Sequence, residues 1–251
     1  MIYAVSDLHG CPVEEFEALL ERAGFGEADR LYVLGDVIDR GPWGLELLCR
    51  IMDRPNIHFL LGNHESILLN CSFLFGEEEI PPERMTRRQL LFLENWMLNG
   101  GGPTLRSFLE LRDRDPKQLS RVLEFLNRAP LYQVVKAGGR EFILCHSGLG
   151  GFHRWKPLRA YSPRELLWER PGKDTFYYPD KTVIFGHTPT VIYGENYRGR
   201  EYRTDSWICI DAGAAMGESP MLLRLDDLES ICVADHLNTE KESGGSYETE
   251  K

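Results

Sequence analysis

The chain has 251 residues, of which 42% are hydrophobic and 27% are charged. This composition suits one globular domain, or at most two, and it excludes a disordered or fibrous chain. The 29 lysines and arginines against 39 aspartates and glutamates give a net charge of −10, and because no basic cluster appears, we expect no nucleic-acid partner.

The first part of the chain alternates strand-like and helical patterns. An apolar run at residues 2–5 predicts a buried strand, and the apolar spacing from Phe16 to Ala23, which a glycine ends, predicts a helix. Two further apolar runs, at 31–34 and 57–61, are each followed by a helical stretch. This alternation predicts a parallel sheet.

The middle of the chain is helical from about residue 83 to residue 128, with breaks at residues 100–103 and near 115–116. We interpret residues 76–130, approximately, as a helical cap insertion that covers one end of the sheet. Strand-like runs then return, which predicts a second sheet packed on the first. These runs cover residues 131–135, 142–145, 182–185, 207–210, 221–225 and 231–234.

The expected fold is therefore α/β (α+β), a two-sheet β-sandwich flanked by helices. We expect a single domain over residues 1–236. The polar tail at residues 237–251 has too few apolar groups to offset the entropy of ordering, so we expect it to be disordered.

Five polar clusters each follow a strand-like run directly. They are residues 6–10, 35–41, 62–65, 145–148 and 186–188. Taken singly, each is a weak signal, because Asp, Asn or His after a strand often serves only as a turn or helix-cap residue. Ligands of open α/β sheets bind outside the carboxyl ends of the strands, so we expect all five clusters to converge on one crevice.

Six side chains in these clusters carry metal-ligating groups: two carboxylates, one carboxamide and three imidazoles. They are Asp7, His9, Asp36, Asn63, His146 and His187. This mixture of oxygen and nitrogen donors suits manganese, iron or zinc, and it exceeds what one ion needs. We therefore expect two divalent ions, with manganese as the favoured metal and Asp36 as the bridging carboxylate.

The motifs Asp-x-His-Gly, Gly-Asp-x-x-Asp-Arg-Gly, Gly-Asn-His-Glu, His-x-Gly and Gly-His-Thr occur in this order. Together they resemble the signature of the PPP serine/threonine protein phosphatases, within the calcineurin-like metallophosphoesterases. The resemblance runs from Asp7 to about Ala214, and residues 96–102 and 184–189 are similar to the bacterial and phage branch. It implies the calcineurin-like metallophosphoesterase fold and a role for each matching residue.

The resemblance implies that the first ion is held by Asp7, His9 and Asp36. The second would be held by Asp36, Asn63, His146 and His187. The catalytic residues implied are His64 as general acid, Asp39 as its orienting carboxylate, and Arg40 and Arg170 as holders of phosphate oxygens. The assignment of Arg170 has a rival, a solvated arginine paired with Glu169 or Glu165.

The chemistry explains why these residue types are needed. Two ions and two arginines outweigh two carboxylates, so the pocket would attract a phosphate dianion although the chain is acidic. A hydroxide that bridges the ions would attack phosphorus in line, without a covalent phosphoenzyme. The leaving alkoxide of serine or threonine is a strong base, which His64 would protonate.

Two enzymatic functions fit this site. We expect a phosphomonoesterase that acts on phosphoserine and phosphothreonine in proteins. The alternative is a hydrolase of dinucleoside polyphosphates such as diadenosine tetraphosphate. Those hydrolases resemble the same family but typically have Ala and Asp at the positions matching Asp39 and Glu65, so this chain favours the first function. A metal-stabilised binding protein would need neither His64 nor Asp39.

The sequence also predicts the compartment. The six cysteines are widely spaced without a CxxC pair, and the N-terminus has no charged leader followed by an apolar stretch. No apolar run approaches the roughly 20 residues that span a bilayer. We therefore expect a cytoplasmic protein whose partner is a phosphoprotein or phosphopeptide substrate, with no membrane partner. The oligomeric state stays open.

Overall fold

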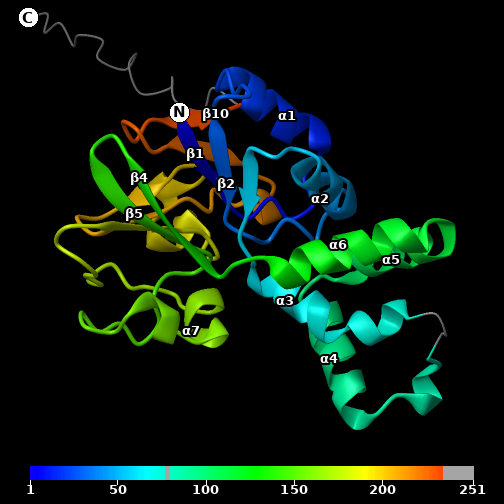
Figure 1. Ribbon diagram of the computed structural model, residues 1–251. Helices are drawn as coiled ribbons and strands as arrows, with labels where there is room; N and C mark the ends of the chain where they lie inside the picture. Colours follow the sequence, from blue (N-terminus) through cyan, green and yellow to red (C-terminus); the bar gives the residue numbers. More distant parts are fainter. Residues whose placement is uncertain (77–79, 234–251) are drawn as a thin grey trace, which may run out of the picture.

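The computed structural model describes residues 1–76 and 80–233, and its strands form two five-stranded sheets (Figure 1). The first sheet has the order β10-β9-β1-β2-β3, in which β1, β2 and β3 are parallel while β9 and β10 run antiparallel to their neighbours. Its strands are β1 (Ile2–Val5), β2 (Arg30–Val33), β3 (Ile57–Phe59), β9 (Met221–Arg224) and β10 (Ser230–Cys232).

The second sheet has the order β4-β5-β6-β8-β7, with β5, β6 and β8 parallel and an antiparallel strand at each edge. Its strands are β4 (Tyr132–Ala137), β5 (Arg140–Cys145), β6 (Thr182–Phe185), β7 (Tyr202–Arg203) and β8 (Trp207–Cys209). The β4–β5 hairpin turns at Gly138 and Gly139, both with positive φ, as the Gly-Gly pair predicts. The sequence does not predict β7, because two residues show no alternation.

Helices contribute to one core on the side of the first sheet that faces away from the second sheet. They are α1 (Val13–Arg22), α2 (Gly44–Met52), α3 (Asn63–Asn70), α4 (Arg87–Leu98), α5 (Gly102–Arg114) and α6 (Pro116–Arg128). A short helix, α7 (Pro163–Leu167), packs outside the second sheet. Side-chain caps define three of the starts: Thr86 accepts a hydrogen bond from the Gln89 N–H before α4, Asp115 accepts one from the Gln118 N–H before α6, and Ser162 accepts one from the Glu165 N–H before α7.

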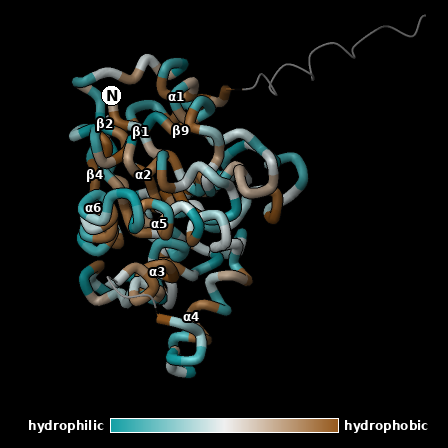
Figure 2. Tube along the Cα trace, turned by 90° about the vertical axis from the view of Figure 1, so that its right-hand side faces the viewer, coloured by the Kyte–Doolittle hydropathy of each residue, from teal (hydrophilic) through white to brown (hydrophobic). Residues whose placement is uncertain are grey.

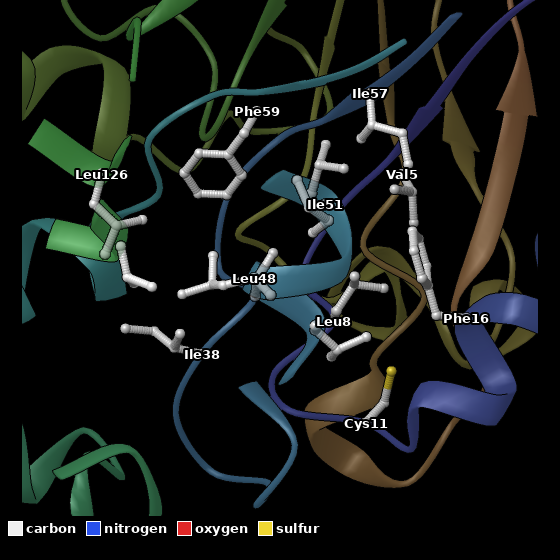
Figure 3. Close-up of a cluster of buried hydrophobic side chains, with 14 of the residues drawn as sticks. Val5, Leu8, Cys11, Phe16, Ile38, Leu48, Ile51, Ile57, Phe59 and Leu126 are labelled. Carbon is white, nitrogen blue, oxygen red and sulfur yellow. The ribbon is translucent and has the colours of Figure 1, made fainter. Parts of the chain in front are cut away.

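The residues of β1 alternate between two cores. Tyr3 and Val5 face the helices, whereas Ala4 faces the second sheet. Figure 3 shows part of the helix-side core, where Val5 and Phe16 lie beside Leu8 and Ile51. Both faces of the first sheet are thus buried. Because a strand points successive side chains to opposite faces, each strand needs a continuous apolar run.

The predicted helical insertion comprises α4, α5 and α6, and it joins the helix-side core. Leu119, Val122 and Leu126 of α6 recur on one face and are buried in the same core as Leu48 of α2. Helices α5 and α6 therefore pack against α2, and α6 also contacts α3. Figures 1 and 2 both show α4 projecting beyond the rest of the molecule.

The predicted fold class is confirmed: two mixed sheets packed on each other and flanked by helices. The predicted boundary at residue 236 and the tail at 237–251 lie outside the described residues. Within residues 1–76 and 80–233, no helix combines the length and apolar character that crossing a bilayer requires.

Candidate metal centre

The five polar clusters of the sequence follow strands of both sheets, and the structure brings them together. All six predicted ligand residues are buried. Asp36 follows β2 in the first sheet, yet its Oδ2 lies 3.4 Å from Nε2 of His146, which follows β5 in the second. The His187 N–H, after β6, donates a hydrogen bond of 2.8 Å to Asp7, after β1. The expected convergence on one site is therefore observed.

Asp36 lies at the middle of this cluster. Its Oδ2 is 3.7 Å from Nε2 of His9, 3.9 Å from Nε2 of His64 and 3.4 Å from Nε2 of His146. Its other oxygen, Oδ1, accepts a hydrogen bond of 3.0 Å from the His64 backbone N–H. One oxygen thus binds the protein backbone, and Oδ2 alone faces ring nitrogens, which come from two loops and the start of α3.

The donor atoms fall into two groups that share Asp36. One ligand atom each from His9, Asp36 and His64 lie within 4.8 Å of one another, and so do those of Asp36, His146 and His187. Such spacing suits two ions that share one carboxylate oxygen. His64 enters the first group by distance, although its Nδ1 is already bonded to Asp39.

Backbone carbonyls fix the orientation of two predicted ligand histidines. Nδ1 of His9 lies 3.1 Å from the Ile38 oxygen, and Nδ1 of His146 lies 2.7 Å from the Leu34 oxygen. Since a carbonyl only accepts, each Nδ1 carries the proton and each Nε2 is left to face the cluster. Ligand histidines in metalloproteins are oriented in the same way.

The contact between His146 and Asn63 tests whether the cluster suits a cation. Nε2 of the ring and Oδ1 of the amide are 2.7 Å apart. With the proton on Nδ1, both atoms are acceptors in the neutral state, so their approach is favourable only with a proton or another cation beside them. The donor set therefore fits a bound metal ion.

The pKa shifts of the buried groups describe the same field. Burial raises the pKa of Asp7 to about 6, and the Asp36 carboxylate adds to this effect. Burial lowers the pKa of His9 to about 3 and that of His187 to about 2, so both rings are neutral. Burial opposes a charge on His146, but the Asp36 and Asp7 carboxylates raise its pKa to about 10. Positive charge is thus favoured beside Asp36.

Strained backbone is concentrated at this site. Among the described residues, seven non-glycine residues have a φ in the positive region, and six of them are predicted site residues: Asp7, His9, Asp36, Asp39, Arg40 and His187. Such conformations cost about 1–3 kcal/mol each and persist only where the surroundings enforce them. The unusual backbone conformation is thus found where side chains from these strand ends meet in the cluster.

Glu65 is a site residue to which the sequence analysis gives no role. Its fully buried carboxylate accepts hydrogen bonds from four backbone N–H groups, those of Gly62, Asp36, Val37 and Ile38, at 2.8–3.3 Å. It therefore holds the Asp36 loop against the start of α3. The spacing from Gly62 to Glu65 predicts only the local bond to the Gly62 N–H, not the bonds to the Asp36 loop.

Asp211 is a second missed residue. It follows β8 and is buried, and burial together with Asp7 raises the pKa of its carboxyl well above the usual range. Its Oδ1 accepts a hydrogen bond of 3.0 Å from the Gly213 N–H. The rule that selected the other clusters, a polar residue directly after a strand, would have selected Asp211 too.

His64 and Asp39 form a buried pair beside the donor cluster. Nδ1 of His64 lies 2.7 Å from Oδ2 of Asp39, and both side chains are almost fully buried. Burial opposes a charge on His64, but Asp36 and Asp39 outweigh it and raise the pKa of the ring. The pair is thus arranged to keep a proton on a ring whose Nε2 faces Asp36.

The two predicted phosphate-binding arginines are exposed and lie at different loops. The Arg40 guanidinium contributes to lowering the pKa of His9, which places its charge near that ring. Nη1 of Arg170 donates to the His187 carbonyl at 3.1 Å and to Thr188 Oγ1 at 3.3 Å. Arg170 follows α7 rather than belonging to a helix. The rival pairing with Glu165 is disfavoured, because Lys156 binds that carboxylate at 2.6 Å.

Comparison with known proteins adds family information. The family model described as calcineurin-like phosphoesterase matches residues 1–214. A symmetrical bis(5'-nucleosyl)-tetraphosphatase of Pseudomonas fluorescens strain SBW25 is 31% identical over 189 residues, which cover 74% of this chain and 56% of the relative. The chain thus spans about half the length of this relative.

Two other similar proteins match over nearly their whole length. The asymmetrical bis(5'-nucleosyl)-tetraphosphatase PrpE of Geobacillus thermodenitrificans is 23% identical over 254 residues, 91% of this chain and 92% of the relative. A crystal structure of a candidate diadenosine tetraphosphatase matches with a TM-score of 0.59 and 19% identity. The match covers 92% of this chain and 91% of the chain in that structure, and it shows the fold alone. The relatives are thus named tetraphosphatases, so the expected PPP resemblance holds only for the wider superfamily.

Proposed function

Because the chain belongs to the calcineurin-like phosphoesterase family, we propose that it is a metal-dependent phosphohydrolase whose substrates are dinucleoside tetraphosphates. The position of Asp36 carries the first part of this proposal. Its Oδ2 faces three imidazole nitrogens at 3.4–3.9 Å and belongs to both groups of donor atoms. Two groups of donor atoms that share one carboxylate support a site for two cations.

Two divalent ions, when bound, would lower the pKa of a bound water and offset the charge of a phosphate group. They would be held by Asp7, His9, Asp36, Asn63, His146 and His187. Arg40 and Arg170, from loops beside the cluster, would bind phosphate oxygens. His64, oriented by Asp39, would give its Nε2 proton to the leaving oxygen. Glu65 would keep Asp36 in place through the backbone.

The substrate class is proposed from the relatives. Those that match over about three quarters of this chain, and the one that matches over nearly all of it, are named for bis(5'-nucleosyl) tetraphosphates. The phosphoanhydride of such a substrate has a phosphate leaving group, which is a weak base. Its cleavage therefore depends mainly on charge compensation, which the ions and the two arginines would supply.

The test is hydrolysis by the purified protein with manganese. Diadenosine tetraphosphate and a phosphoserine peptide are supplied at equal concentration, and the products are separated by chromatography. We expect faster cleavage of the tetraphosphate, into two ADP if the cleavage is symmetrical and into ATP and AMP if it is not. Without hydrolysis of either substrate with manganese, iron or zinc, the phosphohydrolase proposal fails.

A second candidate function has its own observation. The His64–Asp39 pair supplies a proton to a leaving group, and this matters most when that group is a strong base such as the alkoxide of serine or threonine. The pair therefore favours a phosphomonoesterase acting on phosphoproteins. A higher kcat/KM on the phosphopeptide than on the tetraphosphate would make this the function.

A further inference from the structure

The end of α4 and the start of α5 contact the loop that carries Asp39 and Arg40. Nε1 of Trp96 donates to both carboxylate oxygens of Asp39, at 3.1 and 3.0 Å. Thr104 Oγ1 accepts a hydrogen bond of 2.9 Å from the Asp39 N–H, and the Gly100 carbonyl accepts one of 2.9 Å from the Arg40 N–H. We call Trp96, Gly100 and Thr104 the clamp.

The clamp holds a strained pair of residues. Asp39 and Arg40 have φ of 69° and 70°, in the region that non-glycine residues rarely adopt. Two consecutive residues in this conformation persist only when their neighbours fix them. The two backbone hydrogen bonds to Thr104 and Gly100 do this from outside the loop.

Trp96 acts on the side chain of Asp39. Both residues are fully buried, and a buried carboxylate needs donors for its oxygens. The indole N–H is a donor only, so it cannot take the His64 proton. Because it spans both oxygens, it restricts the rotation of the carboxylate and keeps Oδ2 on Nδ1 of His64, 2.7 Å away.

The glycines after Trp96 make this approach possible. A Cβ at Gly101 would overlap the indole ring, and one at Gly100, whose φ is +92°, would come within 2.9 Å of Arg40 Cγ. The turn between α4 and α5 therefore admits the tryptophan only because it carries no side chains there.

We propose that Trp96 is a positioning residue for proton donation. Its indole N–H fixes the Asp39 carboxylate, and through it the direction in which Nε2 of His64 presents its proton. This inference rests on the proposed function, because it concerns the proton donor of that reaction. The polar contact of Trp96 with the site is made through Asp39.

A space-filling role is the competing explanation, since the Trp96 ring also packs edge-on against Phe75 with centroids 6.3 Å apart. Trp96→Phe separates the two, because it keeps an aromatic ring and removes the N–H. Trp207→Phe is the matched control: Trp207 is equally buried and donates from Nε1 to the Thr175 carbonyl at 2.9 Å, outside the site.

The first measurement is the dependence of kcat on the leaving group, using p-nitrophenyl phosphate and phenyl phosphate, which differ little in shape. We expect Trp96→Phe to lower kcat for phenyl phosphate by about ten- to a hundredfold, the range for one hydrogen bond to a charged group, and to lower it far less for p-nitrophenyl phosphate. KM and bound metal should stay as in the wild type, and Trp207→Phe should leave the ratio unchanged. Equal losses on both substrates would overturn the proposal.

The second measurement needs no activity. In the metal-free protein, the proton on Nδ1 of His64 should give a downfield NMR signal that Asp39→Asn removes. Trp96→Phe should weaken or broaden this signal, and Trp207→Phe should not. If Trp96→Phe does not fold, Thr104→Val removes another part of the clamp. A wild type that cleaves no phosphate compound sinks the proposed function alone, whereas an unchanged signal in both clamp variants sinks the clamp.

Discussion

Replacement of Asp36 should affect the site more than replacement of any other single residue, because one of its oxygens faces three ring nitrogens. We predict that Asp36→Asn weakens the binding of both metal ions by at least about 10–100-fold, since the shared negative charge is lost to both. Metal analysis of dialysed protein should then find close to no bound metal, against two ions per wild-type chain. Asp53→Asn, at the exposed end of α2, is the control. Retention of one full ion would show that Asp36 serves one metal only.

His64 should matter according to how basic the leaving group is. We predict that His64→Asn slows hydrolysis of an alkyl phosphate by about 10²–10⁴-fold and that of p-nitrophenyl phosphate far less, because nitrophenolate leaves without a proton. The measurement is kcat on both substrates, with His153→Asn, an exposed loop residue, as the control. If the two rates fell equally, His64 would have another role.

The candidate metal ligands could be selected from the sequence because each belongs to a polar cluster that follows an apolar run. Glu65 and Trp96 could not be, for a physical reason: their partners are backbone groups or carboxylates far along the chain, at separations of 28 and 57 residues. Their function lies in a contact, and no local pattern records it. Asp211 did follow a strand and was still missed.

Helices were predicted where the apolar spacing is regular, yet their position depends on partners. The sequence predicts a helical insertion over one end of the sheet, and in the structure α5 and α6 pack against α2, where their apolar faces join the helix-side core. The apolar face of α6 is visible in the sequence, whereas the surface it covers is not. Short strands such as β7 have too few residues for any pattern.

The position of α6 makes a testable difference to stability. We predict that Leu126→Ala lowers the free energy of unfolding by about 2–5 kcal/mol, because Leu126 is fully buried in the core that covers the first sheet. Leu98→Ala on α4, where the side chain is 82% exposed, should change it by no more than about 0.5 kcal/mol. Denaturant unfolding of both variants measures the difference. Equal losses of unfolding free energy in the two variants would contradict the packing of Leu126 in this core.

For the molecule as a whole, the order of the strands predicts the two sheets. It also predicts that the five polar clusters meet, since parallel strands bring their carboxyl ends to one side. The substrate could not be predicted. The retained Asp39 and Glu65 favour a phosphomonoesterase, whereas the matched relatives are named for tetraphosphates. The proposed ligand set would suit either reaction, so it does not distinguish the two substrates.

Metal binding should link the stability of the whole fold to pH. Burial opposes a charge on His146, but Asp36 and Asp7 raise its pKa to about 10 in the metal-free protein. A histidine with a raised pKa in the folded state adds stability that is fully present below its unfolded pKa, about 6.5, and is lost as the pH rises toward 10. Metal ions, in contrast, need His146 without that proton and bind more tightly as the pH rises.

We therefore predict that the Tm difference between zinc-loaded and metal-free protein widens as the pH rises from about 6.5 to 9. Thermal unfolding with and without a chelator measures it at each pH. Replacement of His146 by Asn should remove most of the widening, because the competing proton is gone, whereas His58→Asn, at an exposed histidine outside the site, should retain it. A Tm difference that stays constant or narrows over this range would mean that protons and metal ions do not compete for His146. His146 would then not be a metal ligand.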